Sequence, residues 1–309
     1  MTKKELKRIE SKVFSVSVVI PSFNGEKILK KNLPSLIKAK SNSRNNIKEI
    51  IIVDDGSEDG SVAFLRDNYR NIKLLENKIN KGFSISVNKG ARIAKGDLLL
   101  LINIDVIPTH DFLEPVFKHF EDEKVFAVSL HEKNYGWAKG YFGDGYIQLS
   151  MGEDSEIAHE SFYVSAGSGV FRRKYWEKLG GMDEKLLSPF YWEDIDLCFR
   201  AAKRGYINLW EPKANVLHKH ESTISSEFRK IYVQRIKERN QLLVIWKNIH
   251  SQKLMFKHLI GVFLRTVKHP GYLRIIVMAL SQIGIALKSR KKEMKESKVS
   301  DGVIFSRFT

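Results

Sequence analysis

The chain has 309 residues, of which 43% are hydrophobic and 11% aromatic, and its formal net charge is +16. This composition suits a packed core and excludes an intrinsically disordered protein, and the length allows one large domain with an appendage or two domains. The single cysteine, Cys198, excludes an internal disulfide, suits a reducing compartment and is expected to be a small buried side chain. Residues 1–12 are charged and lack the apolar core of a signal peptide, so we expect a cytoplasmic protein.

The positive charge is concentrated in the last quarter of the chain. Residues 228–309 contain 18 Lys/Arg and 4 Asp/Glu, a net +14, which leaves +2 for residues 1–227. This shift predicts a boundary near residue 225. The predicted parts are a basic N-terminal segment (1–12), a catalytic domain (13–225) with a nucleotide-binding half (13–106) and an acceptor half (107–225), and a basic amphipathic helical tail (226–309).

Apolar stretches alternate with helical patterns in the first half of the chain, which indicates βαβ units and a parallel sheet. The expected strands are 16–20, 47–53, 71–75, 98–104 and 124–130, and the expected helices are 27–39, 61–68 and 81–94. Right-handed crossovers place the carboxyl ends of the first, second and fourth strands along one edge, where α/β proteins bind ligands. Three polar clusters would meet there: Ser22 with Asn24, Asp54 with Asp55, and Asn103 with Asp105.

The fourth predicted strand, 98–104, is a continuous apolar run, too short for a membrane helix and typical of a strand buried on both faces. Alternation along it points Asn103 and Asp105 the same way and Ile104 back into the fold. Pro108 then ends the ladder. An Asn-x-Asp pair at this place can hold a divalent metal and a nucleotide, although both residues are also common in turns.

The glycine-rich phosphate signatures of nucleotide-binding folds are absent from the sequence. The diphosphate of a bound nucleotide would therefore depend on a metal ion, which a carboxylate such as Asp105 can hold. Asp54 or Asp55 can accept hydrogen bonds from a base or a ribose. The alternative for these two residues is that they cap the helix that follows.

A second cluster of polar residues lies further along the chain. Two aromatic residues precede three acids at a predicted helix start: Tyr191 and Trp192, then Glu193, Asp194 and Asp196. Acids in a first turn offset the helix dipole, but three in four positions exceed that need. Their crowding raises at least one pKa, which suits a general base toward a hydroxyl.

A histidine pair, His218 and His220, follows a short apolar stretch, and the two side chains share a face if the segment is extended. A single histidine is more often a core residue than a ligand. A pair at a strand end is also compatible with metal binding.

Taken in order, these motifs resemble those of the family 2 glycosyltransferases, which have the GT-A fold and use nucleotide-sugar donors. The resemblance spans residues 14–220, about two thirds of the chain. It implies an α/β GT-A fold, with a Rossmann-like, mostly parallel central sheet flanked by helices and a C-terminal basic helical extension. The matching motifs are Val18–Asn24, Val53–Ser61, Asn80–Phe83 with Asn88–Gly90, Asn103–Asp105, Gly180–Asp183 and Glu193–Arg200.

The resemblance also implies a metal-dependent, inverting transfer of one sugar to a hydroxyl of a glycan or lipid-linked glycan. Asp105 would hold Mg²⁺ or Mn²⁺, with His218 as a metal or diphosphate contact and His220 as a second candidate. Asp194, with Glu193 beside it, would deprotonate the acceptor hydroxyl. The implied donor-binding residues are Pro21, Ser22, Asn24, Asp54, Asp55, Gly82, Asn88 and Asn103.

The sequence departs from the family pattern at Ile104, which we expect to face away from the metal. The Gln-x-x-Arg-Trp motif of processive synthases is absent, which favours a non-processive, rhamnosyltransferase-like enzyme of cell-surface polysaccharide or glycolipid synthesis. The alternatives are a sugar-phosphate nucleotidyltransferase and a non-enzymatic basic protein that binds membrane or nucleic acid. The first would carry a Gly-rich basic loop where residues 21–26 have one glycine. A non-enzymatic basic binding protein would not account for the carboxylates at the strand ends.

The basic tail is expected to be helical and amphipathic. Its longest uncharged run, 275–287, has 13 residues, against roughly 20 for a membrane-spanning helix. Apolar stripes with Lys/Arg flanks favour peripheral attachment to an anionic membrane, on the inner face of the cytoplasmic membrane. A packing module with a solvated basic face is the main alternative. The tail carries no named nucleic-acid motif, so we expect no nucleic-acid partner. The sequence is also compatible with a homo-oligomer.

Overall fold

A computed structural model describes residues 14–219 and 228–308. The strands are β1 (Val16–Ser22), β2 (Ile47–Asp54), β3 (Lys73–Glu76), β4 (Leu98–Ile102), β5 (Val106–Pro108), β6 (Val125–Glu132), β7 (Ala138–Gly143), β8 (Tyr146–Met151), β9 (His159–Glu160), β10 (Ser168–Arg172) and β11 (Ile207–His218). The α-helices are α1 (Glu26–Ser41), α2 (Ser61–Asn68), α3 (Phe83–Ile93), α4 (Glu114–Phe117), α5 (Arg173–Leu179), α6 (Glu193–Lys203), α8 (Lys230–Asn248), α9 (Gln252–Lys268), α10 (Leu273–Leu280), α11 (Ile283–Glu296) and α12 (Asp301–Phe305). Short 3₁₀ helices are η1 (Ser43–Asn45), η2 (Lys118–Glu121) and η3 (Pro270–Tyr272).

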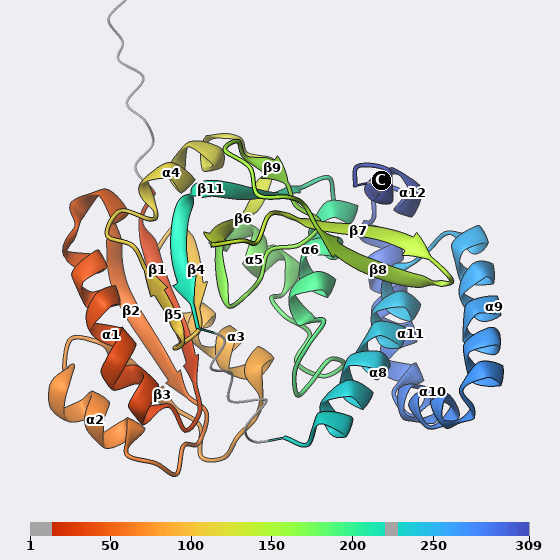
Figure 1. The fold of residues 1–309 in the computed structure, drawn as a ribbon, viewed down its shortest axis with the longest axis horizontal. Helices are drawn as coiled ribbons and strands as arrows, with labels where there is room; N and C mark the ends of the chain where they lie inside the picture. Colours follow the sequence, from red (N-terminus) through yellow and green to blue (C-terminus); the bar gives the residue numbers. More distant parts are fainter. Residues whose placement is uncertain (1–13, 220–227, 309) are drawn as a thin grey trace, which may run out of the picture.

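One mixed, curled sheet organises the first two thirds of the chain (Figure 1). Its order is β3-β2-β1-β4-β10-β6-β11-β5, and β9 pairs with β11. The four strands β3, β2, β1 and β4 are parallel, as the alternating pattern predicted. Beyond β4 the sheet is mixed, because β10 runs antiparallel to both β4 and β6. The α/β prediction is therefore confirmed.

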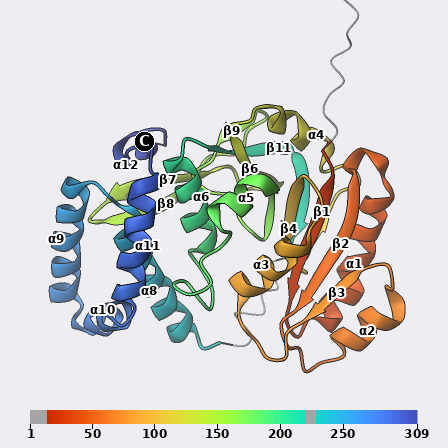
Figure 2. The same cartoon turned by 180° about the vertical axis from the view of Figure 1, so that it is seen from behind.

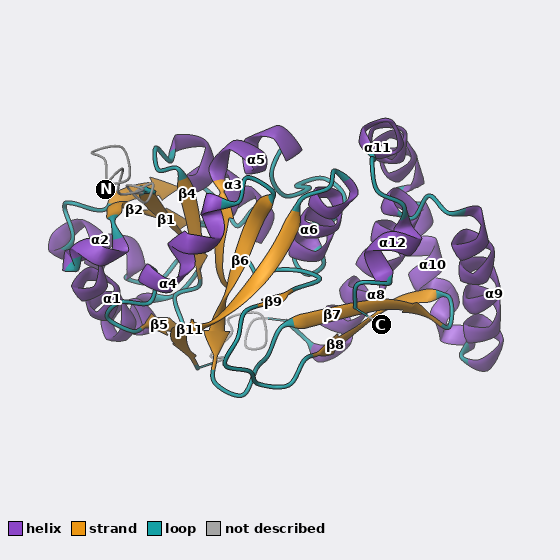
Figure 3. Ribbon diagram, turned by 90° about the horizontal axis from the view of Figure 1, so that it is seen from above, coloured by secondary structure: helices purple, strands orange, loops and turns teal. Residues whose placement is uncertain are grey.

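Helices cover both faces of this sheet (Figure 3). Helices α1, α2 and α4 contribute to the core on one face, and α3, α5 and α6 to the core on the other. The whole of β4 is at most 1% exposed, since it contributes side chains to both cores. Burial on two faces explains why this strand is a continuous apolar run. Cys198 lies in the second core, as expected for a lone cysteine.

The fourth predicted strand ends earlier than expected. Strand β4 stops at Ile102, and residues 103–105 form a turn in which the Val106 amide bonds the Asn103 carbonyl at 3.2 Å. The strand alternation that was predicted for Asn103 and Asp105 is therefore wrong. The chain then enters β5, so Pro108 ends a separate edge strand paired with β11.

The C-terminal helices share a third core with the body of the molecule. This core combines side chains of α6, the β7–β8 hairpin and α8 to α12 (Figure 2). Four consecutive residues of α8, Leu242–Ile245, are 0% exposed. The sequence did not predict the hairpin, whose strands have weak apolar alternation. Among the described helices none alone has the length and apolarity to cross a bilayer; the bent pair Pro270–Leu280 and Ile283–Glu296, at 66°, meets that criterion jointly.

Candidate active site

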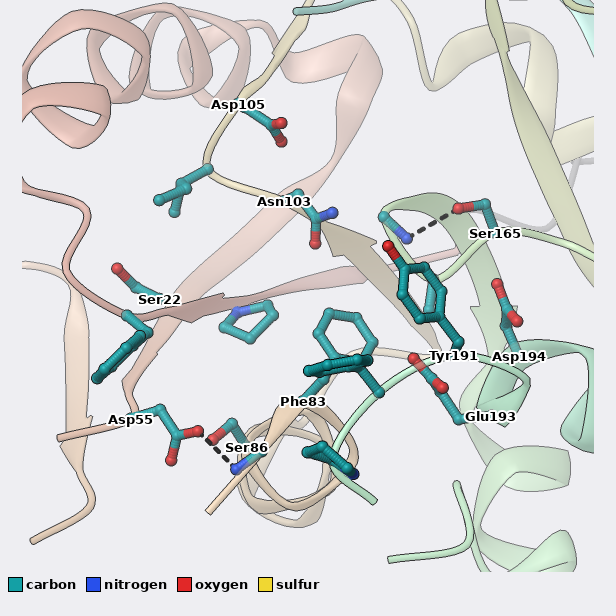
Figure 4. Close-up of a pocket in the computed structure, with 18 of the residues that line it drawn as sticks. Ser22, Asp55, Phe83, Ser86, Asn103, Asp105, Ser165, Tyr191, Glu193 and Asp194 are labelled. Carbon is teal, nitrogen blue, oxygen red and sulfur yellow. Dashed lines mark hydrogen bonds between the residues drawn. The ribbon is translucent and has the colours of Figure 1, made fainter. Parts of the chain in front are cut away.

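A cavity of about 320 Å³ lies at the carboxyl ends of β1, β2 and β4, where the sequence placed the ligand. It is bounded on the other side by the segment before α6 and by the first turn of α6 (Figure 4). Nine of the predicted site residues line it: Pro21, Ser22, Asp55, Gly82, Asn103, Asp105, Glu193, Asp194 and His218. The sheet topology therefore brings motifs that are 170 residues apart to one site.

Asp105 and His218 meet through pairing of β5 with β11. The register sets His218 opposite Val106, so the imidazole Nε2 lies 3.3 Å from Asp105 Oδ1. The other ring nitrogen lies 2.9 Å from Glu132 Oε1, at the end of β6. Ser168 Oγ also donates to that oxygen at 2.8 Å. Burial alone would lower the pKa of His218, but its bonds to Asp105 and Glu132 raise it to about 9.

This group of side chains suits a divalent cation only in part. A carboxylate oxygen and an imidazole nitrogen are ligands that Mn²⁺ and Mg²⁺ sites use. Among the described residues, no three His, Cys, Asp or Glu side chains converge closely enough to hold an ion alone. A cation at Asp105 and His218 would therefore need further oxygens, such as those of a diphosphate, and Glu132 would orient the imidazole from behind.

Asp55 anchors one wall of the cavity. Its carboxylate accepts the backbone amides of Lys81 at 2.9 Å and Gly82 at 2.8 Å, and the Asn77 amide at 2.7 Å. Gly82 has φ of 94° and caps α3, and a Cβ there would lie 3.0 Å from the Pro189 carbonyl oxygen. Only glycine fits this backbone without strain. Asp55 thus shapes the wall as well as facing the cavity.

Ser22 and Asn103 offer polar atoms on the side of the cavity where Asp105 lies (Figure 4). Ser22 is 3% exposed and its hydroxyl oxygen has no hydrogen-bond partner. A buried polar atom without a partner is costly, and a ligand hydroxyl or amide would satisfy it. Ile104 was expected to point into the fold. It packs against Gly25 but also lines the cavity.

Two acids from the start of α6 face the cavity from the opposite side (Figure 4). Withdrawal from water raises the pKa of Asp194 from 3.8 to about 6, although the amides of Ile195 and Ala166 bond its carboxylate and oppose the shift. Burial and the charge of Asp194 raise the pKa of Glu193 well above 4.5. At neutral pH Asp194 is therefore an ionised carboxylate that is more basic than an ordinary aspartate, and its charge together with burial favours the protonated form of Glu193.

The segment before these acids has a strained backbone. Tyr191 and Trp192 have φ of 69° and 76°, a left-handed conformation that costs non-glycine residues on the order of 1–3 kcal/mol each. Such strain persists only where surrounding contacts hold it, and it is common at functional sites. Tyr191 lines the cavity directly (Figure 4).

Two neighbouring residues of α8 hold this segment in place. The amide of Asn240, 0% exposed, donates to the carbonyls of Leu187 at 2.8 Å, Phe190 at 3.0 Å and Tyr191 at 2.8 Å. Arg239 donates to the Ser188 carbonyl at 2.5 Å and to the Asn240 side-chain oxygen. Four carbonyls of the cavity wall are thus bound by the C-terminal region.

Three predicted donor-binding residues do not line the cavity. Asp54 accepts the amides of Gly56 and Ser57 and the Ser57 hydroxyl within the loop that follows β2, and it does not cap α2, whose N-cap is Gly60. Asn24 accepts the Glu58 amide at 2.9 Å. Asn88 bonds both backbone groups of Met182. These side chains shape the loops around the cavity. His220 lies outside the described residues.

Sequence reasoning missed several residues of the site. Glu132 lies two residues after the predicted strand 124–130 and is the last residue of β6, so a polar residue at a strand end was the available signal. Arg239 and Asn240 gave no local signal, because their partners lie about fifty residues earlier. Phe228 lines the cavity and packs on Phe190, with ring centroids 5.2 Å apart. The described start of the C-terminal region is therefore part of the cavity wall.

Comparison with known proteins points to one family. A family model described as glycosyl transferase family 2 matches residues 17–180, slightly more than half of the chain. The chain is 29% identical over 220 residues to the pre-mycofactocin glycosyltransferase of Mycobacterium tuberculosis, a match that covers 68% of this chain and 43% of that protein. It is 20% identical over 234 residues to the O-antigen chain rhamnosyltransferase RfbN of Salmonella typhimurium, covering 70% of each.

A solved structure supports the fold assignment. The structure of GalNAc-T7 with UDP, GalNAc and Mn²⁺ superposes with a TM-score of 0.62 at 17% identity, and the match covers 77% of this chain and 48% of that one. At this identity the likeness shows a shared GT-A-like fold. The chain spans less than half the length of the mycobacterial relative.

Proposed function

The chain belongs to glycosyl transferase family 2, and on that premise we propose that it moves one sugar from a nucleotide-sugar donor to an acceptor hydroxyl, with inversion at the anomeric carbon. One observation carries the proposal. A single cavity has Asp105 and His218 on one side and the acid pair Glu193 and Asp194 on the other. The first pair suits a donor diphosphate with a divalent cation, and the second suits proton removal from an acceptor.

The donor side would use the groups at the strand ends. Asp55 accepts hydrogen bonds from a base or ribose, and Ser22 and Asn103 bond the ribose or diphosphate through their free polar atoms. Mg²⁺ or Mn²⁺ bound by Asp105 and His218 would offset the diphosphate charge. Glu132 keeps the imidazole turned toward Asp105. The relative solved with UDP and Mn²⁺ supports a divalent cation in this fold.

The acceptor side would use the acid pair. The Asp194 carboxylate takes the proton of the acceptor hydroxyl while its oxygen attacks the anomeric carbon. The bond from that carbon to the diphosphate oxygen breaks on the opposite face, and the configuration inverts. A base with a pKa near 6 suits this step, because it is ionised at neutral pH and more basic than an ordinary aspartate. Burial and the charge of Asp194 raise the pKa of Glu193, which favours a carboxylic acid that can donate a hydrogen bond into the cavity.

The acceptor we propose is a glycan or lipid-linked glycan of the cell envelope. The O-antigen rhamnosyltransferase relative supports this class. The sequence lacks the Gln-x-x-Arg-Trp motif of processive synthases, which supports transfer of one sugar per catalytic event.

Two variants test the two sides of the cavity. Asp105→Asn should abolish Mn²⁺-dependent binding of nucleoside diphosphates in a thermal-shift screen, because the variant lacks the charged carboxylate that would bind the cation.

Asp194→Asn should keep donor binding and lower kcat by about 10²–10⁴-fold, the usual contribution of a general base. Since a buried Asp with a raised pKa destabilises the fold at neutral pH, this variant should melt no lower than wild type. Full transfer by Asp194→Asn would overturn the base assignment.

A further inference from the structure

Helix α9 has an inner face fixed by specific contacts. His258 is 0% exposed, donates from Nδ1 to the Gly145 carbonyl at 2.7 Å and accepts the Trp246 indole N–H at 3.0 Å. Arg265, about two helical turns after His258, bonds Glu238 of α8 at 2.9 Å. These contacts set the rotation of α9 about its axis, so its other face is held outward.

The outer face of α9 exposes a continuous apolar stripe. Figure 1 shows α9 at the edge of the molecule, with α8 and α11 on its inner side. Six large side chains repeat at helical spacing and are 43–66% exposed. They are Phe256, Leu259, Ile260, Phe263, Leu264 and Val267. Scattered exposed apolar residues are normal, whereas a stripe three turns long marks an interaction surface.

The charge around this stripe indicates what covers it. Between residues 239 and 292 the sequence has eleven Lys/Arg and no Asp/Glu. At 100° per residue, the exposed lysines Lys253, Lys257 and Lys268 run along one margin of the stripe. A partner that matches both the apolar stripe and the lysines has an apolar interior and an anionic surface. A second copy docked through the same face would meet these lysines with a helix that has no acidic residue, and a nucleic acid would leave the stripe uncovered.

We propose that the outer face of α9, meaning these six apolar residues and three lysines, docks on an anionic lipid bilayer with the helix parallel to the surface. The apolar side chains enter the acyl boundary and the lysines contact lipid phosphates. The proposal narrows the attachment predicted for the whole tail. Helix α8 presents no comparable stripe, since most of its apolar side chains, Leu242–Ile245 among them, fill the third core. Docking of α9 on a bilayer is independent of the activity proposed above.

Vesicle flotation of the full chain tests the proposal. Wild type should float with phosphatidylcholine vesicles that contain about 30 mol% phosphatidylglycerol, and weakly with phosphatidylcholine alone. The double change Leu259→Ser and Phe263→Ser should lower the partition coefficient about tenfold or more. Changing Lys253, Lys257 and Lys268 to Gln should remove the preference for anionic vesicles. Ile157→Ser is the matched control, because Ile157 is an apolar side chain of similar exposure, 67%, that lies outside α9.

Three results would overturn the proposal. The first is that the wild-type protein stays in the soluble fraction at low salt. The second is that the Leu259→Ser/Phe263→Ser protein floats like wild type. Light scattering that shows a dimer in wild type and a monomer in the double variant would assign the stripe to a second copy instead. Melting temperatures should match across the variants, because all substituted side chains are exposed.

Discussion

The acid pair at the start of α6 is the chemically most perturbed part of the site. Asp194 and Glu193 are adjacent in sequence, and burial raises the pKa of both, while the charge of Asp194 raises the pKa of Glu193 further. Two neighbouring acids with separated pKa values can take different roles at one pH. In this cavity the shifts assign the role of base to Asp194.

The activity should depend on pH through Asp194. Because protonated Asp194 cannot accept a proton, kcat/KM should fall about tenfold per unit below pH 6, rather than below the ordinary value of 3.8. Initial rates across this range, with melting temperature recorded at each pH, measure the effect. A rate that stays flat down to about pH 5, with the fold intact, would remove Asp194 as the base.

Glu132 should affect the cation without touching it. Its carboxylate accepts from His218 and Ser168, and loss of such an orienting partner commonly weakens metal binding about 10–100-fold. Glu132→Gln should therefore weaken Mn²⁺ binding in a titration followed by electron paramagnetic resonance, with nucleoside diphosphate present. Glu153→Gln, at an exposed loop position, should bind as wild type. Equal affinities for the two variants would show that Glu132 plays no orienting role.

At the scale of elements, helix α8 determines the shape of the cavity wall. Arg239 and Asn240 bind the carbonyls of the segment that precedes α6, including the strained Tyr191. The strain would relax if these bonds were lost, since nothing in an isolated chain favours a positive φ at a tyrosine. The C-terminal region is thus a positioning element for the acid pair.

Asn240→Ala should separate positioning from simple stability. Leaving three carbonyls without a donor should lower the free energy of unfolding by about 1–3 kcal/mol. If α8 positions the acids, kcat should also fall and the low-pH limb of the rate profile should move. Gln234→Ala, exposed on the same helix, should change neither quantity. A stability loss with an unchanged pH profile would limit Asn240 to a structural role.

At the scale of the whole molecule, buried ion pairs join the C-terminal helices to α6. Lys247 of α8, 3% exposed, bonds Asp183 at 2.8 Å and Asp196 at 2.9 Å. Burial would raise the pKa of Asp196, but the charges of Lys247 and Arg200 lower it to about 2. Ionised Asp196 therefore makes its full contribution to the free energy of unfolding above pH 3.8, and this contribution is lost as the pH falls toward 2.

Lys247→Met should destabilise the whole protein. Removing one partner leaves the buried carboxylate of Asp196 and the partly buried carboxylate of Asp183 undercompensated, which costs about 3 kcal/mol or more. Urea unfolding at neutral pH measures the difference, and acid unfolding should begin at higher pH in the variant. Lys253→Met, exposed on α9, should stay within about 0.5 kcal/mol of wild type. Similar unfolding midpoints for both variants would contradict the proposed link between α8 and α6.

The sequence by itself determined the parallel βα units, the buried strand β4 and the motifs at the strand ends. These follow from apolar periodicity and turn residues, which act over a few neighbours. It also determined that Asp55 and Asp105 would share one site, because strand ends of a parallel sheet meet at one edge. The place of Asp194 in the same site was implied by the resemblance to the family.

Only the tertiary structure decided how His218 meets Asp105, which carboxylate orients it, and that α8 holds the wall beside the acids. Each depends on a register or packing contact between segments far apart in the chain. No local pattern fixes such contacts. The same holds for α9. Its sequence shows apolar residues around much of the helix, and the contacts of His258 decided which of them face outward.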